Sequence, residues 1–557
     1  MTRQGLINLI NRPLFVFIAS GFIGAVIFIT IYGIGVINPT NVQWLQADMG
    51  DMSQHYLGWL FYRQSDWSPV LGSIDNLAYP HGLAVTFMDS IPLLAIPFKL
   101  ISFMLPEQFQ YFGLWGIACY VFMGALGGLV IHRLTHNTPF AILGSMILAW
   151  SPLVIQRMFA HTALAGHWIV LAGIYLLIRF NKQSRLWVFL TCWSIVLAIS
   201  ACIHPYFIPM NLAILVMSAI FTFKNFRDLS IRIMIPAVIA LGVFFVIGGF
   251  VVTDVSGGEV RDYGLNADAL INAVGWSSIL INNPPRPLAY EAFAYVGFGV
   301  VAMGIILAYT LFTSLRRLKE GRLQRLINIY CKPRWLAAYG IGLAVIVAAV
   351  SPTIHVGDFT LVVPMPLLVE KVWSVFRATG RLFWPVYYLV MIGSIVLLYR
   401  TMRAHVSQKL LIIFFATIVA LQGFDITQSV NARAKHERFI VAGEVTYISP
   451  INVAKWNNAA NGRAHIQFIG DAQAPQFFAV GYIAVEQHMT MSDGYFARSP
   501  YESVRQTSAA ARNDILSGNA RRDTLYLSSE PGVGQYAQSS PELNVFKDYD
   551  VYVITTK

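Results

Sequence analysis

The sequence predicts a polytopic α-helical membrane protein with a small C-terminal α/β domain. Of its 557 residues, 56% are hydrophobic and only 12% are charged, about half the charged fraction of a typical soluble domain. Long apolar runs fill the chain up to about residue 425, and shorter runs of mixed composition follow. We therefore expect a membrane domain over residues 1–425 and a soluble domain over residues 426–557.

Eleven apolar runs are long enough, or nearly so, to cross about 30 Å of hydrocarbon as helices. The first run is too long for a signal peptide and no small-residue cleavage site follows it, so we expect an uncleaved anchor. The predicted spans are residues 14–37, 109–131, 140–155, 164–178, 186–203, 206–223, 233–252, 292–312, 335–350, 383–399 and 410–424.

One further apolar segment, residues 90–106, is barely long enough to span. It contains Pro92, Pro97 and Lys99, and a full crossing would place Arg133 outside the cell. We expect this segment to enter the membrane without crossing it.

The basic residues between the spans fall in alternate loops, which the positive-inside rule assigns to the cytoplasm. This distribution explains much of the +11 formal charge without a nucleic-acid partner. The N-terminus is then cytoplasmic, and the C-terminal domain lies outside the membrane. The basic positions are Arg3, Arg12, Arg133, Arg179, Lys182, Arg185, Lys224, Arg227, Arg232, Arg316, Arg317, Lys319, Arg322, Arg325, Lys332, Arg334, Arg400, Arg403 and Lys409. The outward pieces are residues 38–89, 253–291, 351–382 and everything after residue 425.

The C-terminal segment has the pattern of a small α/β domain. Its short apolar runs, bounded by Gly, Pro, Asn and Asp, are typical of strands, and residues 503–516 are typical of a helix. The runs are residues 466–469, 477–483, 524–527 and 551–555.

The first outward loop contains Asp51, Gln54 and His55 among many aromatic residues, a mixture that suits a helix lying at the membrane interface. Helical spacing places His55 one turn after Asp51 on the same face. This would put a carboxylate and an imidazole where water meets lipid. Alternatively, Asp51 caps the start of the helix within a solvated loop.

Asp89 precedes the 90–106 segment, and Pro92 follows it closely, as at a helix start. Asp89 alone is most simply interpreted as a helix cap. However, the topology places it at the same membrane level as Asp51, and two carboxylates in one pocket can divide the roles of base and orienting group.

A basic group lies in the third outward loop. Arg377 and Arg381 are four residues apart, just before a span, with Glu370 and Lys371 upstream. If they lie one helical turn apart, the two guanidinium groups can hold a phosphate. The alternatives are interfacial arginines whose charged ends reach water, or partners of nearby acids.

Four more polar residues, Arg157, His161, His167 and His204, fall at the outer level. Each histidine alone is usually an ordinary satisfied polar residue, but their accumulation indicates a shared polar cavity. No spacing matches a zinc motif, so no motif supports a metal site, and a divalent metal is left open as an alternative.

The 253–291 loop, with Gly257 and Gly258 and the stretch 282–286, is either a mobile cover for this cavity or a simple connection. No Gly-rich nucleotide loop is found on the cytoplasmic side. The energy source for a reaction on the outer side would therefore have to reach the site by way of the membrane.

Four local strings are similar to a bacterial family of the GT-C superfamily of membrane glycosyltransferases. They are GDMSQHYLGW (residues 50–59), DSIPL (89–93), FQYFGLW (109–115) and FRATGR (376–381). The order of an outward Asp, interfacial helices, many spans, a basic outward loop and a C-terminal soluble domain also resembles that superfamily.

The resemblance implies a polyprenyl-phosphate-linked sugar donor used on the periplasmic face of the bacterial inner membrane. The acceptor would be a surface glycan such as O-antigen, a lipid or a protein. In this class the first-loop Asp acts as base or orients the acceptor, which maps onto Asp51, with Asp48 as its nearest competitor. A paired acid often follows a later span, whereas this chain has Arg157, His161 and His167 there, so the resemblance supports no divalent metal.

The chemistry of the residues agrees with an inverting displacement. A carboxylate must take the acceptor proton, and arginines can stabilise the departing lipid phosphate. We expect Asp51, Asp89 and His55 to be catalytic. We expect Arg377, Arg381, Lys371 and Arg157 to bind the phosphate. The expected substrate pocket contains Gln54, His161, His167 and His204.

Two other functions remain open. A transporter or flippase of a lipid-linked saccharide would favour ionisable groups in mid-span and matching halves, and the sequence has no internal repeat. A structural scaffold would leave Asp51 and Arg377 without a role.

Overall fold

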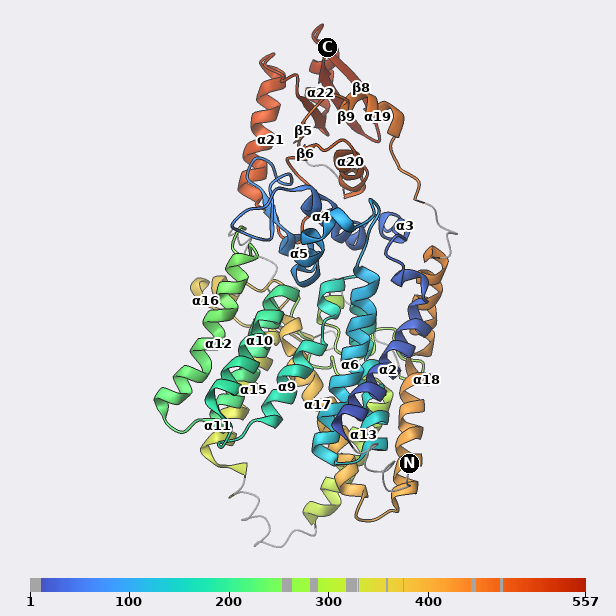
Figure 1. Ribbon diagram of the computed structural model, residues 1–557, viewed down its shortest axis with the longest axis vertical. Helices are drawn as coiled ribbons and strands as arrows, with labels where there is room; N and C mark the ends of the chain where they lie inside the picture. The colour runs from blue at the N-terminus through green and yellow to red at the C-terminus, as the bar shows by residue number, and fades with distance from the viewer. Residues whose placement is uncertain are drawn as a thin grey trace.

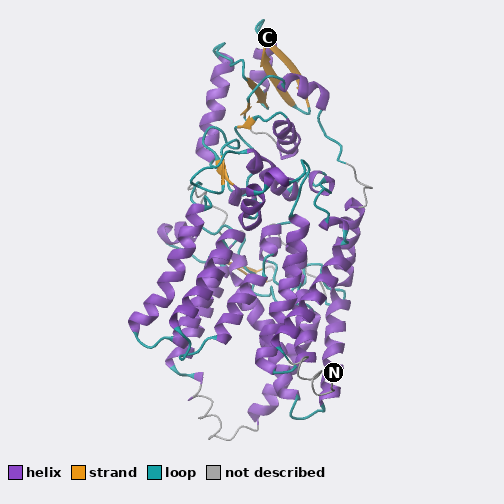
Figure 2. Cartoon of the chain, in the orientation of Figure 1, coloured by secondary structure: helices purple, strands orange, loops and turns teal. Residues whose placement is uncertain are grey.

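The computed structural model describes residues 12–252, 263–280, 289–316, 328, 330–356, 359–373, 375–441, 447–470 and 474–557. A long helical bundle carries a smaller domain with a β-sheet at one end (Figures 1 and 2). Interfacial helices lie between the two. The architecture agrees with the predicted class, a polytopic helical protein with a C-terminal α/β domain.

The described residues contain nine helical stretches that are long and apolar enough to cross a membrane. The described residues also contain three shorter apolar helical stretches, which are α11, the apolar part of α13, and residues Phe477–Glu486 of the C-terminal domain. Each predicted span overlaps one of these helices, and the number of actual crossings stays a prediction. The bundle helices are α2 (Pro13–Tyr32), α6 (Phe112–Thr135), α7 (Thr138–Ala149), α8 (Pro152–Arg157), α9 (Trp168–Arg179), α10 (Leu186–Ile203), α11 (Phe207–Thr222), α12 (Phe226–Val246), α13 (Phe298–Arg316), α15 (Pro333–Val350), α17 (Trp384–Met402) and α18 (Gln408–Val441).

Small residues allow close packing in the bundle. A Cβ at Gly24 of α2 would lie 2.0 Å from the carbonyl oxygen of Tyr120 on α6, and one at Gly124 would lie 2.1 Å from that of Ser20. Only glycine permits this approach of the two backbones, as is common between helices in membranes.

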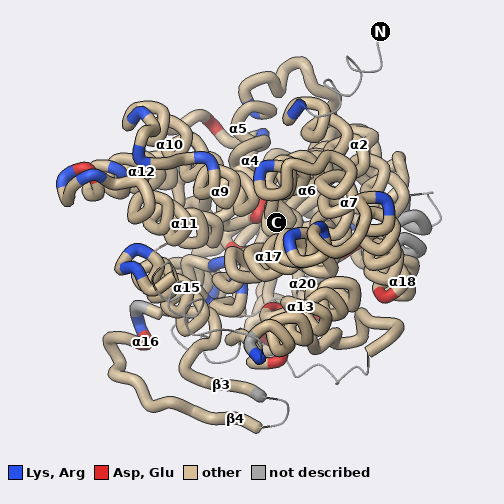
Figure 3. The backbone as a smooth tube through the Cα atoms, turned by 90° about the horizontal axis from the view of Figure 1, so that it is seen from below, with Lys and Arg blue, Asp and Glu red and all other residues tan. Residues whose placement is uncertain are grey.

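Basic helix ends gather at the end of the bundle away from the sheet domain. Arg400 Nη2 at the end of α17 donates to the carbonyl of Leu134 at the end of α6 (3.4 Å). Arg334 at the start of α15 lies over the ring of Phe223 after α11 (5.1 Å). Figure 3, viewed from this end, shows Lys and Arg near α9, α10, α12, α15 and α17. The described basic residues of the predicted loops therefore gather at one end of the bundle, whereas Arg3, Arg317, Lys319, Arg322 and Arg325 lie outside the described part of the chain.

The 90–106 segment forms the short helix α5 (Pro92–Leu100) and the 3-10 helix η3 (Ser102–Met104). Nine α-helical residues extend about 14 Å, well short of the hydrocarbon thickness. Arg63 lies near the end of helix α4 (Asp51–Gln64). Its Nε donates to Ser102 Oγ (2.7 Å) and its Nη1 donates to the carbonyl of Pro106 (2.8 Å), which holds the end of the 90–106 segment against α4. This geometry supports the expectation that the segment does not cross.

The C-terminal domain has a five-stranded sheet in the order β6-β5-β7-β9-β8. Strand β5 is parallel to both β6 and β7, whereas β9 is antiparallel to β7 and β8. The strands are β5 (His465–Ile469), β6 (Thr490–Met491), β7 (Thr524–Ser528), β8 (Leu543–Asp548) and β9 (Val551–Thr556). The helices are α19 (Val453–Ala460), α20 (Ala474–Glu486), α21 (Tyr501–Leu516) and α22 (Pro531–Ser539).

Most sequence predictions for this domain are confirmed. The runs 466–469, 524–527 and 551–555 lie in strands, and residues 503–516 lie in α21. The run 477–483 is a correction, since it belongs to helix α20 rather than to a strand. It faces α4, where Gly481 lies against the side chain of Leu57.

Backbone hydrogen bonds join the C-terminal domain to residues 76–87 of the loop that precedes Asp89. Tyr79 N donates to the carbonyl of Met491 (2.9 Å), and Met491 N donates to that of Asn76 (2.9 Å). Ala497 N donates to the carbonyl of Phe87 (2.9 Å). The segment after β6 thereby lies against the loop that contains Asp89.

The orientation in the membrane can be tested with a native cysteine. Cys331 is exposed at the basic end, just before α15. We expect a membrane-impermeant maleimide to leave Cys331 unlabelled in intact spheroplasts and to label it after permeabilisation. An introduced Ser539→Cys in the C-terminal domain should be labelled without permeabilisation. The reverse pattern would contradict the predicted orientation.

Candidate functional site

Asp51 is the first residue of α4, but it does not cap the helix. Asp48 Oδ2 accepts a hydrogen bond from Met52 N (3.0 Å) and thereby satisfies the helix start. Asp51 instead turns toward His161, with 3.2 Å between its Oδ2 and the imidazole Nδ1. The capping alternative thus belongs to Asp48, and the Asp51 carboxylate is left for another role.

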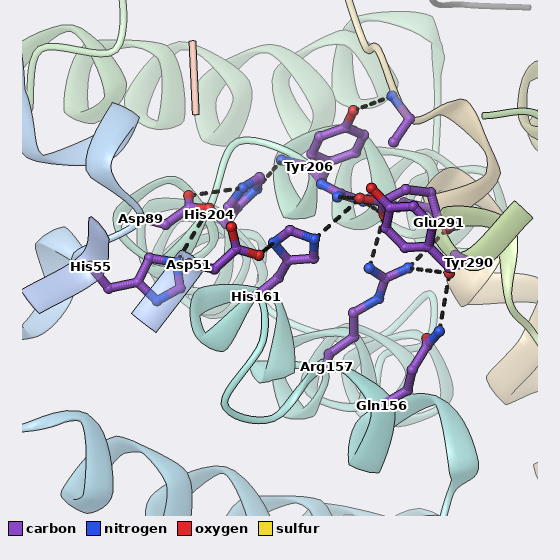
Figure 4. A network of polar contacts seen from close by, with 12 residues as sticks. Asp51, His55, Asp89, Gln156, Arg157, His161, His204, Tyr206, Tyr290 and Glu291 are labelled. Carbon is purple, nitrogen blue, oxygen red and sulfur yellow. Dashed lines mark hydrogen bonds and ion pairs between the residues drawn. The ribbon is translucent and has the colours of Figure 1, made fainter. Parts of the chain in front are cut away.

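His161 connects Asp51 to a buried acid that lies far away in the sequence. Its Nε2 is 3.2 Å from Oε1 of Glu291, whose side chain is 1% exposed. The imidazole therefore bridges two carboxylates (Figure 4).

Glu291 also binds two arginines. Arg381 donates from Nε to Oε2 (2.9 Å) and from Nη2 to Oε1 (2.6 Å), which is a bidentate pair. Arg157 Nη1 donates to the same Oε2 (2.8 Å). We call Asp51, His161, Glu291, Arg157 and Arg381 the ionic cluster.

Hydrogen bonds from α8 and to α18 hold the segment that contains Glu291 in place. Glu291 lies in the 3-10 helix η6 (Ala289–Ala292), and Arg157 Nη2 of α8 donates to the Glu291 carbonyl (2.9 Å). Farther along, Asp425 of α18 accepts hydrogen bonds from Tyr295 Oη (2.6 Å) and Phe298 N (2.9 Å). A polar residue at the end of a predicted span thus fixes the segment between Glu291 and α13.

Asp89 forms a second set of contacts next to the ionic cluster. Its backbone is left-handed (φ 52°) at the end of the 3-10 helix η2 (Val85–Met88). Its Oδ1 is 3.3 Å from His204 Nε2, and its Oδ2 is 3.9 Å from His55 Nε2. Ile91, and not Asp89, occupies the N-cap position of α5. The prediction of Asp89 as an N-cap is therefore wrong, and Asp89 instead lies at the C-cap position of η2.

His55 does not pair with Asp51, contrary to the sequence prediction. The imidazole is fully buried beside the ring of Phe112, while the side chain of Asp51 remains 30% exposed. Asp89 comes to His55 from η2, because Ser90 Oγ donates to the His55 carbonyl (2.7 Å) and fixes that approach.

The two carboxylates next to His161 differ in basicity. Burial raises the pKa of Asp51, and the nearby charges of Asp89 and Glu291 raise this pKa further, while His161 lowers it. Burial also raises the pKa of Glu291, but the charges of Arg381 and Arg157 lower that pKa more, so it lies well below its usual range. Glu291 is therefore ionised, and Asp51 is the better proton acceptor.

Burial lowers the pKa of His55 to about 4 against the opposing effect of Asp89. This imidazole is consequently neutral at pH 7. Burial alone would raise the pKa of Asp89, but the contact with His204 lowers this pKa below its usual range.

The predicted spacing of Arg377 and Arg381 is corrected by the structure, whereas their binding of a phosphate stays a prediction. Arg381 lies in the 3-10 helix η7 (Thr379–Phe383), whereas Arg377 precedes it in a loop, so the two are not one α-helical turn apart. Gly380 approaches Ala292 so closely that a Cβ would lie 2.9 Å from it. Arg381 shares Glu291 with Arg157, and Arg377 lies exposed over the ring of Tyr263 (5.5 Å).

The remaining predicted residues lie outside the ionic cluster. His167 is buried and stacks on Trp384 (4.0 Å). Gln54 is buried and lines a small cleft between α4 and the C-terminal domain. Lys371 is exposed on helix α16 (Leu367–Trp373). The proposed cover residues 257–258 and 282–286 lie outside the described part of the chain.

The described residues contain no group of three or more His, Cys, Asp or Glu placed to bind a metal ion. Asp51, His161 and Glu291 are joined to one another by ion pairs.

Sequence reasoning missed Glu291 as a site residue. One signal was present, since Glu291 is the last polar residue before the predicted span 292–312. Arginines that become buried at the outer level need a counter-charge, and an acid at that same level was available to supply it.

Two family models match the chain. The model described as "Domain of unknown function (DUF6311)" matches residues 21–427. The model described as "DUF6311 C-terminal domain" matches residues 455–554. The comparison with curated proteins finds no match.

Removal of the Glu291 charge should destabilise the protein. Glu291→Gln leaves Arg157 and Arg381 buried without their carboxylate, and the loss of one partner from a buried pair costs about 3–5 kcal/mol. We expect a clear drop in melting temperature in detergent. The matched control is Glu502→Gln, which breaks an exposed pair with Arg505 and should cost less than about 1 kcal/mol. Equal effects of the two variants would contradict the assigned role of Glu291.

Acidification should destabilise the fold through His55. Since the pKa of His55 is about 4 in the folded protein, against an ordinary histidine value of 6.5, the unfolded chain binds the proton more readily. Stability is then full above pH 6.5 and falls as the pH decreases toward 4. His55→Gln should flatten this dependence in thermal unfolding, whereas the exposed control His405→Gln should not. An unchanged slope in His55→Gln would refute the assignment.

Proposed function

The chain belongs to the family described as "Domain of unknown function (DUF6311)", and from its site we propose that it is a membrane glycosyltransferase. It moves a monosaccharide from a polyprenyl-phosphate carrier to an acceptor hydroxyl. The observation that carries this proposal is the part-exposed Asp51 carboxylate, bridged by His161 to the buried Glu291 and its two arginines.

Asp51 is suited to act as the general base. Its side chain is 30% exposed, so an acceptor can reach it, and its raised pKa makes it more basic than an ordinary aspartate. The acceptor oxygen forms a bond to the anomeric carbon while the proton moves to Asp51. The bond between that carbon and the phosphate oxygen breaks, and its electron pair leaves with the lipid phosphate. The configuration at the anomeric carbon inverts.

His161 is suited to position Asp51. Its Nδ1 faces Asp51 and its Nε2 faces Glu291, at 3.2 Å in each case. An imidazole held at both nitrogens keeps one orientation. His161 therefore keeps the base in a fixed direction.

Arg381 is suited to stabilise the leaving phosphate. It donates through Nε and Nη2 to Glu291, and its Nη1 has no hydrogen bond to a described residue. This preorganised cation can oppose the negative charge that develops on the phosphate. Arg377 adds a second cation nearer the surface, over Tyr263.

The proposed location follows from topology. Helix α4, which begins with Asp51, lies at the end of the bundle that carries the C-terminal domain (Figure 1), away from the basic loops. With the positive-inside rule this end is periplasmic in the bacterial inner membrane. The acceptor is then a molecule of that compartment, such as a surface glycan including O-antigen.

Asp51→Asn should change the rate of sugar transfer without lowering the stability of the protein. Since ionised Asp51 is disfavoured by burial, Asp51→Asn should keep or raise the melting temperature. We expect sugar transfer to fall at least about 1000-fold, as measured by mass spectrometry of surface glycans in a complemented deletion strain.

The matched control is Asp48→Asn, because asparagine also accepts the hydrogen bond that starts α4. It should retain transfer within a few-fold of wild type. Undiminished transfer by Asp51→Asn, or equal loss in both variants, would reject Asp51 as the base.

A further inference from the structure

A strongly apolar surface lies beside the candidate site on the third outward loop. Strands β3 (Thr353–Val356) and β4 (Phe359–Val362) form a hairpin that extends outward from the bundle near α15 and α16 (Figure 3). Leu361 is 49% exposed and Val362 is 57% exposed. On α16, Leu367 and Leu368 are 68% and 74% exposed.

The chemistry of this hairpin places it at the membrane interface. A two-stranded sheet has unpaired N–H and C=O groups along both edges, which are too costly to bury in hydrocarbon. Its apolar side chains are equally unsuited to bulk water. The compromise is the boundary region, where the backbone reaches water and the side chains reach lipid.

This surface is continuous with a lipid-facing helix. Trp373 Nε1 of α16 donates to the carbonyl of Ala348 near the end of α15 (2.9 Å). On α15 itself, Leu343 and Val347 are 62% and 52% exposed. We call these two residues, with Leu361, Val362, Leu367 and Leu368, the apolar strip.

The apolar strip ends at the ionic cluster. Thr379 Oγ1 donates to the carbonyl of Ala349 (3.3 Å), which joins the end of α15 to η7 and therefore to Arg381. Gly380 N donates to the carbonyl of Tyr263 (3.0 Å), the residue that Arg377 covers. An interfacial apolar surface thus leads directly to two guanidinium groups.

We propose that the apolar strip binds the isoprenoid chain of a polyprenyl phosphate, with the phosphate held near Arg377 and Arg381. The chain chemistry matches the apolar side chains, and the phosphate charge matches the two arginines. This assignment rests on the proposed function for its ligand class, and it adds the surface by which the donor lipid approaches. Ordinary phospholipids would cover all lipid-facing surfaces alike.

Photo-crosslinking in lipid nanodiscs tests this surface directly. A photoreactive amino acid is placed at Leu361 or Leu368 of the full chain. Matched controls are placed at Val238 and Phe245 of α12, which are 59% and 63% exposed. The probes are a radiolabelled polyprenyl phosphate, the corresponding polyprenol and phosphatidylglycerol.

We expect polyprenyl phosphate to label positions 361 and 368 at least tenfold more than positions 238 and 245. Polyprenol and phosphatidylglycerol should label the four positions within about twofold of one another. Arg377→Gln, whose side chain is exposed and need not affect folding, should reduce the preference for polyprenyl phosphate severalfold. Equal labelling of both surfaces by polyprenyl phosphate would overturn the proposal, and so would efficient competition by phosphatidylglycerol.

The outcome is independent of sugar transfer. If Asp51→Asn abolishes transfer but labelling shows no preference, this inference fails and the proposed function stands. If labelling is selective but no sugar moves, the lipid surface stands and the proposed reaction fails.

Discussion

The buried carboxylate of Glu291 is the constraint on which the candidate site depends. Two arginines from α8 and η7 and a histidine next to η4 (Thr162–Ala165) are directed to it. A charge with this little exposure is tolerable only when it is fully paired. Satisfying Glu291 therefore fixes the positions of Arg157, Arg381 and His161, and His161 in turn fixes Asp51.

Short helical segments carry the residues around Glu291, namely α8, η4, η6 and η7. Short helices and loops join the bundle at the level of the C-terminal domain, and their polar side chains meet there rather than in mid-span. Asp425 on α18 anchors the segment after Glu291, and the C-terminal domain covers the loop before Asp89 through Ala497. A part-exposed carboxylate and buried arginines thus lie close together.

Much of the fold could be predicted from the sequence, because membrane crossing imposes long apolar runs and alternating basic loops. Asp51, His161, Arg157 and Arg381 could be grouped because ionisable residues at an outward boundary need a common polar environment. Three features could not be predicted. The acid at Glu291 looks like an ordinary loop end until the arginines are placed. Spacing alone suggested a helix for Arg377 and Arg381, whereas Arg381 lies in the 3-10 helix η7, where Gly380 packs closely against Ala292. The run 477–483 is apolar enough for a strand, but it lies in helix α20, which packs on α4.

The most direct test of the central claim follows the lipid product. Purified protein in liposomes is supplied with lipid-linked sugar and glycan acceptor extracted from the deletion strain, and free polyprenyl phosphate is quantified. The account predicts one polyprenyl phosphate released per sugar transferred by the wild-type protein, and none released by Asp51→Asn. Movement of intact lipid-linked saccharide across the bilayer without release of polyprenyl phosphate would contradict it.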